Sequence, residues 1–141
     1  MEECDLRSAN FTNALMTGVS LQGADVRHAT LDLEALFPTG CLAGAVLGRL
    51  RWRNKGMKAA LLQGANLVKS DFHGCDMRKA DLRKANLTGC DLTGACMDNA
   101  QLQGADLTGA NLTGAVLTNA DLTGTTMDVA RLMKVTVPPP L

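Results

Sequence analysis

The 141-residue chain has very few aromatic residues and no net charge. Phe, Trp and Tyr make up 3% of the residues, with one Trp and no Tyr, although hydrophobic residues make up 46%. The core must therefore consist mainly of aliphatic side chains. The 14 Lys and Arg residues balance the 14 Asp and Glu residues, which argues against a protein whose whole surface binds or imitates a nucleic acid.

Long hydrophobic segments, a signal sequence and paired cysteine motifs are also lacking. No apolar run approaches the roughly 18 residues that a membrane helix needs. The N-terminal stretch MEECDLRSANF has neither the basic start nor the apolar segment of a secretory signal. The five cysteines are odd in number and form no C-x-x-C pair, which favours reduced thiols over a disulfide framework or a zinc site. These features predict a single cytoplasmic domain that has no membrane contact.

What the chain does contain is a five-residue repeat, as in ADLTGANLTGAVLTNADLTG at residues 105–124. From Leu62 to Leu132 a large apolar residue, which we call the centre, occurs every five residues, and a small residue stands two positions before almost every centre. A helix would spread such residues around its circumference, and a flat strand would turn successive centres to opposite faces. The period instead predicts a chain that is extended within each repeat and bends once between repeats.

Glycine supports this interpretation, because ten of the 14 glycines stand two positions after a centre, where a bend can use positive φ. A chain that bends regularly winds into a solenoid whose neighbouring coils pair like strands. The same small and large pairs begin near the N-terminus, from Cys4 and Leu6 to Ala29 and Leu31. The solenoid should therefore include most of the chain.

The A-[DN]-L-x-x repeat, seen in ADLRK, ANLTG and ADLTG, resembles that of the pentapeptide-repeat family. The resemblance implies an all-β fold, a right-handed quadrilateral β-helix with about 20 residues in each coil. With coils about 4.8 Å apart, each residue would lie over the one 20 positions away. We expect one domain over residues 1–134, with a first repeat block at 4–33, an irregular or degraded coil at 34–59 and a second block at 60–134. A Pro-rich tail at 135–141 would follow.

The repeat loses its phase between the two blocks, because the connecting segment has one residue more than whole repeats need. Two arrangements account for the difference. A single extra residue near Pro38 would let residues 40–59 form a degraded coil, with Lys55 at an inward position. Alternatively, part of 35–58 leaves the coil as a loop or short helix and rejoins it at the second block. We favour the second arrangement, because burying Lys55 without a partner would be costly.

The same region carries the strongest charge signal. Residues 49–84 contain ten bases and three acids, whereas both flanking parts have an excess of acids. Cationic and apolar residues alternate at 49–55, which would give an extended segment one wholly cationic face. This face is either a solvated surface or a docking site for an acidic partner with Trp52 as its anchor, since Trp and Arg dominate interface energies. The candidate partner-binding residues are Arg49, Arg51, Trp52, Arg53, Lys55, Lys58, Arg78, Lys79, Arg83 and Lys84.

The sequence shows no motif for catalysis, for a cofactor or for a metal. His28 and His73 fall on outward positions, and no phosphate-binding loop or nucleophile elbow is present. Cys4, Cys75 and Cys90 fall on inward small positions, where cysteine acts as a compact hydrophobe. The aspartates that precede the centres should hydrogen-bond along the wall of the solenoid. We therefore expect no cofactor, no metal ion and no enzymatic activity.

The predicted function is a non-enzymatic scaffold for protein–protein interaction that uses the outer faces of a rigid β-helix. The stretch KGMKAALLQGANL also resembles the pentapeptide portion of BTB/POZ-domain adaptor proteins, which recruit substrates to cullin ubiquitin ligases. One alternative, implied by bacterial members of the family, is a DNA mimic that protects gyrase or another topoisomerase. Another is nucleic-acid binding by the basic region, which the scarcity of aromatic residues makes a poor fit. The partner would be an unidentified protein, with a second copy or a further domain at the N-terminal end, where no cap precedes the repeat.

Overall fold

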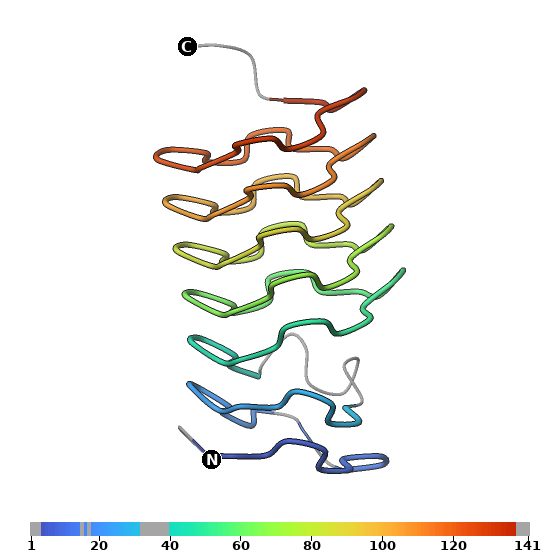
Figure 1. The fold of residues 1–141 in the computed structure, drawn as a ribbon, viewed down its shortest axis with the longest axis vertical. Helices are drawn as coiled ribbons and strands as arrows, with labels where there is room; N and C mark the ends of the chain where they lie inside the picture. Colours follow the sequence, from blue (N-terminus) through green and yellow to red (C-terminus); the bar gives the residue numbers. More distant parts are fainter. Residues whose placement is uncertain (1–3, 15, 17, 32–39, 138–141) are drawn as a thin grey trace.

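Each coil of the chain has four short sides, and a tight turn joins each side to the next (Figure 1). The computed structural model describes residues 4–14, 16, 18–31 and 40–137. These residues contain no helix, and their β structure consists of single parallel bridges between a residue and the one 20 or 21 positions further on. The coils therefore stack directly on one another, and the fold is the expected right-handed quadrilateral β-helix.

Columns of bridging residues, each one position before a centre, define four faces of the rod. Because the chain visits the faces in turn, residues close in sequence soon lie on different sides of the molecule. We number the faces in chain order. Face 1 contains Asp5, Asp25, Val46, Asn66, Asn86, Asp106 and Thr126; face 2 contains Asn10, Thr30, Arg51, Asp71, Asp91, Asn111 and Arg131; face 3 contains Gly56, Asp76, Cys96, Val116 and Thr136; face 4 contains Ser20, Cys41, Leu61, Asp81, Gln101 and Asp121.

Backbone hydrogen bonds join neighbouring coils in both directions. The N–H of a centre donates to the carbonyl 19 residues ahead, as Leu87 does to Asp106 at 2.7 Å. The N–H of a bridging residue donates to the carbonyl 21 residues back, as Asp106 does to Ala85 at 2.9 Å. Within the coil, the N–H of Ala85 donates to the carbonyl of Leu82 at 3.0 Å and closes the turn. The wall thereby satisfies backbone groups that would be costly to bury unpaired.

The turns pass through a residue with positive φ two positions after a centre. All ten glycines predicted at this position have φ between 65° and 70°, which confirms the role inferred for them. Other residue types hold the same conformation at other corners, including Arg49 at 65°, Asn54 at 57° and Lys69 at 57°. A left-handed conformation costs a residue with a side chain about 1–2 kcal/mol relative to glycine. Such corners place a side chain on the surface where glycine would place none.

The interior is filled by the centres and the small residues. Every centre from Leu62 to Leu117 is fully buried, which confirms the predicted core over this range. Leu42, Leu47, Trp52 and Met57 continue the same five-residue spacing in the preceding coil and are also fully buried. Trp52 and Phe72 lie in one column with their rings stacked, their centroids 5.8 Å apart and their planes at 18°. Burial of each such side chain contributes roughly 1.5–3 kcal/mol. The core is thus a narrow column of aliphatic side chains with one aromatic pair.

The expectation that part of residues 35–58 leaves the coil is wrong for residues 40–58. Asp25 bridges to Val46, 21 positions ahead, whereas Val46 bridges to Asn66 at the regular 20. One extra residue before this coil therefore accounts for the change of phase, while residues 35–39 lie outside the described part. Lys55 does occupy an inward position, but it is partly exposed, because its long aliphatic stem can pack while the ammonium group stays in water.

The C-terminal end keeps the pattern but not the burial. Thr136 still bridges to Val116, so the ladder runs beyond the boundary expected at residue 134, with Val135 at a small position and Val137 at the next centre. Leu132, a centre of this last described coil, is 50% exposed. The stabilisation from each centre should therefore depend on the number of coils that cover it.

This dependence can be measured with two matched truncations. Leu87→Ala leaves a cavity between covered coils and should lower the free energy of unfolding by about 2–5 kcal/mol. Leu132→Ala removes the same atoms from a half-exposed position and should cost less than about 1 kcal/mol. Denaturant unfolding followed by the fluorescence of Trp52 gives both values. Equal costs would contradict the stacked-core arrangement.

Candidate functional site

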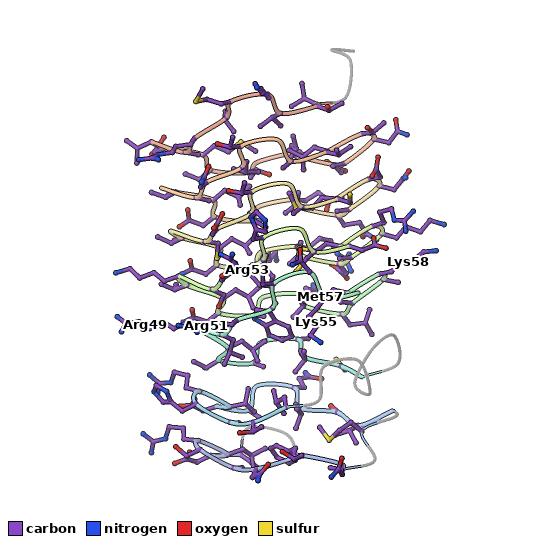
Figure 2. The ribbon with its side chains drawn as sticks, turned by 90° about the vertical axis from the view of Figure 1, so that its right-hand side faces the viewer. Arg49, Arg51, Arg53, Lys55, Met57 and Lys58 are labelled. Atoms are coloured by element: carbon purple, nitrogen blue, oxygen red, sulfur yellow. The ribbon has the colours of Figure 1, made fainter. Side chains whose placement is uncertain are left out.

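The ten residues predicted to bind a partner are spread around the rod instead of sharing one face. Arg51 and Arg53 lie on face 2 and Arg49 at the corner between faces 1 and 2, whereas Lys58 follows the bridging position of face 3. Figure 2 shows Arg49 and Lys58 on opposite sides of the molecule. The single cationic face predicted from alternating residues is therefore wrong, because each corner turns the chain by about a quarter of a circle. Trp52 and Lys55 occupy inward positions. We call the other eight residues the cationic belt: Arg49, Arg51, Arg53, Lys58, Arg78, Lys79, Arg83 and Lys84.

Trp52 does not belong to this surface. Its side chain is fully buried and stacked on Phe72, so the prediction that it anchors a partner is wrong. The reason is its place in the repeat. Residue 52 is the large apolar centre of its repeat, and the side chains of centres point into the core. Alternation with charged residues is typical of an exposed strand edge as well as of this wall, and the sequence pattern alone does not separate the two.

Three members of the cationic belt are held by carboxylates on their own face. The guanidinium nitrogen of Arg78 lies 2.6 Å from a carboxylate oxygen of Asp76, that of Arg83 lies 2.6 Å from Asp81, and that of Arg53 lies 2.9 Å from Asp71. The remaining five form no ion pair with another described residue. These unpaired cations are Arg49, Arg51, Lys58, Lys79 and Lys84, all of them exposed.

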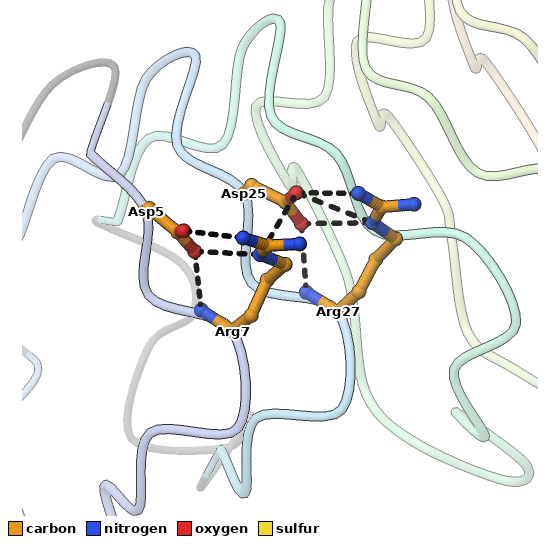
Figure 3. Close-up of polar contacts among 4 residues, drawn as sticks. All are labelled: Asp5, Arg7, Asp25 and Arg27. Carbon is orange, nitrogen blue, oxygen red and sulfur yellow. Dashed lines mark hydrogen bonds and ion pairs between the residues drawn. The ribbon is translucent and has the colours of Figure 1, made fainter.

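A second group of Asp–Arg pairs lies on face 1 near the N-terminus, and sequence reasoning missed it (Figure 3). Arg7 lies 2.7 Å from Asp5, and Arg27 lies 2.7 Å from Asp25, while Arg7 also approaches Asp25 at 3.9 Å. The hydrogen bonds from Arg7 lower the pKa of Asp5 to about 2, and those from Arg27 lower the pKa of Asp25. The signal that finds these pairs is D-x-R around a centre, as in DLR, DVR and DMR.

Other aspartates and asparagines of the wall bond to the backbone, as expected. A carboxylate oxygen of Asp91 accepts hydrogen bonds from the N–H of Thr93 at 3.0 Å and from its hydroxyl at 2.6 Å. Asn111 and Thr113 repeat this arrangement one coil further on. These side chains brace the turn that follows them. Their oxygens are occupied in the wall.

The thiols divide into buried and accessible groups. The S–H groups of Cys75 and Cys90 donate to the carbonyls of Trp52 at 2.8 Å and Leu67 at 3.0 Å. Burial raises the pKa of Cys75 to about 11 and that of Cys90 to about 12, which confirms their inward placement. Cys4 is exposed despite its small position, because it lies at the edge of the first described coil.

The histidines lie where the sequence placed them, on the outer surface. His28 is exposed and His73 partly exposed. Within the described ranges, no three His, Cys, Asp or Glu side chains are grouped so that they could hold a metal ion. The same part of the chain contains no helix with the length and apolarity needed to cross a membrane.

The described geometry defines the class: a parallel β-helix with four faces, a filled interior and a repeat of five residues. The model of the family described as pentapeptide repeats matches eight copies of the repeat, over residues 1–32, 57–94 and 95–132. These ranges include more than half of the chain, which therefore belongs to the pentapeptide-repeat family. A search of curated proteins found no match.

Several solved structures are similar to this chain. A pentapeptide repeat protein from the thylakoid lumen of Arabidopsis thaliana is 26% identical, with 64% of this chain and 59% of that chain covered and a TM-score of 0.46. The protein Rfr23 of the cyanobacterium Cyanothece 51142 is 20% identical, with 96% and 88% covered and a TM-score of 0.44. QnrB1, a plasmid-mediated fluoroquinolone resistance protein, is 17% identical, with 92% and 79% covered and a TM-score of 0.35. The match thus spans less than two thirds of the Arabidopsis protein.

Acid should destabilise the fold through the Asp–Arg pairs. The arginine two residues ahead lowers the pKa of Asp5, Asp25, Asp76 and Asp81 in the folded chain, whereas an unfolded Asp titrates near about 3.9. The pairs should therefore stabilise the fold fully above about pH 5, and this stabilisation should disappear as the pH falls towards 2. Urea unfolding between pH 6 and pH 2 measures the change. Arg83→Met should flatten the profile, and an unchanged profile would contradict the pairing.

Thiol labelling should separate the two groups of cysteines. In the folded protein at pH 8, an aromatic disulfide reagent should react with Cys4, and more slowly with the partly exposed Cys41 and Cys96. Cys75 and Cys90 should react only after denaturant is added, because burial keeps both thiols protonated and covered. Rapid labelling of all five in the folded state would refute this placement.

Proposed function

We propose that this protein is a non-enzymatic scaffold for protein–protein interaction, which acts in the cytoplasm and docks an acidic protein on its cationic belt. The observation that carries the proposal is the unequal pairing of charges. Arg49, Arg51, Lys58, Lys79 and Lys84 are exposed and form no ion pair with a described carboxylate, although many wall side chains beside them are paired. Exposed, unpaired cations on a rigid support give a partner charge complementarity at low ordering cost.

The use of the other polar groups supports a role through binding rather than catalysis. The centres and small residues fill the interior, and wall carboxylates such as Asp81 and Asp91 are held by neighbouring side chains or backbone. The buried thiols are hydrogen-bonded and protonated at neutral pH. The outer faces are thus the part of the molecule that is available for recognition. The cytoplasmic site of action is supported by the five cysteines, all of which are free of disulfides.

A second candidate is a DNA mimic of the kind that protects gyrase. It is favoured by the charge of residues 85–141, which carry five acids and two bases. Two observations count against it. The cationic belt lies directly before this acidic part, and Asp106 and Asp121 are hydrogen-bonded within the wall. Direct nucleic-acid binding is a poorer fit, because Trp52 and Phe72 are buried and offer no ring for base stacking.

A charge-reversal experiment tests the scaffold proposal. The variant with Arg49→Glu, Arg51→Glu and Lys58→Glu should lose at least about tenfold in the amount of protein captured from a lysate of the source cell. The matched control is Arg131→Glu with Lys134→Glu, which reverses exposed cations outside the belt and should keep the capture. Trp52 fluorescence in denaturant checks that both variants fold.

Two results would contradict the proposal. Capture that is unchanged by reversal of the belt would show that its cations do not recognise the partner. Protection of gyrase from a fluoroquinolone in a supercoiling assay would favour the DNA mimic instead. A gel shift with duplex DNA at low and moderate salt examines nucleic-acid binding, which should be absent or fall steeply with salt.

A further inference from the structure

A hollow of about 290 Å³ lies on face 1, beside the corner between faces 1 and 2. Its surface has two chemically distinct parts. Val46, Gly48 and Val68 provide apolar surface, and Arg27, His28 and Arg49 provide polar side chains, with the amide of Asn66 beside them. Arg27 is ion-paired with Asp25, so Arg49 supplies the unpaired positive charge of this lining. The hollow therefore combines an apolar floor with positive charge at one side. This combination suits a ligand that carries both an apolar group and carboxylates.

Gly48 is the lining residue of the hollow that carries no side chain. Gly48 stands directly after a centre, where the neighbouring coils of face 1 carry the side chains of Arg27 and Val68. A Cβ atom at residue 48 would lie 3.3 Å from the carbonyl oxygen of Val68, so a larger side chain would crowd the backbone of the next coil as well as reduce the hollow. The bridging residue of the same side is Val46, where the coil below has Asp25. This coil thus presents no carboxylate on face 1 to neutralise a nearby cation.

Three basic side chains stack at the adjoining corner. His28, Arg49 and Lys69 occupy the same turn position in successive coils, with φ of 63°, 65° and 57°, and all three are exposed. None of them forms an ion pair with another described residue. Gly89 continues the same column, which shows that glycine fits this corner. Side chains in the left-handed conformation also stand at other corners, as at Ala59 and Asn99, so this corner is distinguished by its run of basic side chains and not by its backbone.

We propose that this hollow and corner bind an extended acidic peptide segment in which an apolar side chain lies between carboxylates. The apolar side chain would enter the hollow against Val46, Gly48 and Val68, and the carboxylates would pair with Arg49 and Lys69. Charge complementarity selects this occupant, and the apolar floor favours a peptide over a nucleic acid, whose phosphates would use only the cations. The inference rests on the proposed scaffold function and places its docking site at one corner, where Arg49 of the cationic belt stands in the same column as Lys69, which lies outside the belt.

Peptide binding by the intact chain tests this site. The probes are a fluorescein-labelled DDELEDD peptide and a matched DDESEDD peptide, measured by fluorescence anisotropy at 50 and 150 mM NaCl. The Leu peptide should bind at least about threefold more tightly than the Ser peptide, because one buried apolar side chain adds about 1 kcal/mol or more. Affinity for both peptides should fall with salt.

Two pairs of variants locate the contact. Arg49→Glu with Lys69→Glu should weaken binding of the Leu peptide at least about tenfold. The control, Arg131→Glu with Lys134→Glu, reverses exposed cations outside the cationic belt, with Lys134 in the same left-handed conformation, and should change the affinity less than about twofold. Gly48→Val fills the hollow and should abolish the preference for Leu over Ser. Trp52 fluorescence identifies any variant that does not fold, and the two charge-reversal pairs decide the question without Gly48→Val.

The outcomes separate this inference from the proposed function. Equal losses in the two charge-reversal pairs would show that only net charge is recognised and would refute this site, whereas a loss caused by Lys79→Glu with Lys84→Glu and not by Arg49→Glu with Lys69→Glu would keep the cationic belt as a docking surface and refute this site. The site is also overturned if the wild-type chain binds neither peptide, or if it binds a 20-base-pair DNA duplex more tightly than the Leu peptide. Peptide binding that is lost only with Arg49 and Lys69 would support the site, even if capture from the lysate shows that the partner uses a different face.

Discussion

The structure depends on the register between successive coils. Inter-coil hydrogen bonds join a residue to one 19 positions ahead or 21 positions back, as the bonds of Leu87 and Asp106 show, and these spacings become 20 and 22 only across the extra residue. A shift of register would place centres over turns and leave backbone groups unpaired, which costs more than most side-chain changes, and the 21-residue spacing from Asp25 to Val46 keeps the bridging residues in register. The one irregularity is therefore confined to a single extra residue, after which the bridge from Val46 to Asn66 restores the regular spacing.

This register also decides which residues are available for function. The centres and small residues are buried in the core, and the bridging residues form the walls. Many of the remaining charged side chains pair with each other on the same side of a coil, as Asp81 and Arg83 do. The corners differ, because a side chain in the left-handed position has no fixed partner in its own repeat. Arg49 and Lys69 stand at such corners, and this is why recognition is proposed there.

Whether a charged side chain of this molecule is paired thus depends on its position in the repeat and not on the segment of the sequence in which it lies. Residues 49–84 are basic as a stretch, yet Arg78 and Arg83 are neutralised by the carboxylates of their own sides. The positive potential that remains comes from scattered unpaired cations around the rod, one of which, Arg49, lines a hollow together with Val46, Gly48 and Val68. A partner that contacts both the cations and the hollow is recognised by shape as well as by charge.

The sequence by itself determined the period, the core and the turns, because these depend on local residue types that recur every five positions. Centres such as Leu87 and left-handed glycines such as Gly94 follow from it directly. Only the tertiary structure decided that Trp52 is buried, that Lys55 is tolerated in a coil and that the basic residues form a belt. These facts depend on what lies 20 or 21 residues away and on the direction in which each corner turns the chain. Local sequence contains neither quantity, because both arise when separate coils pack against one another.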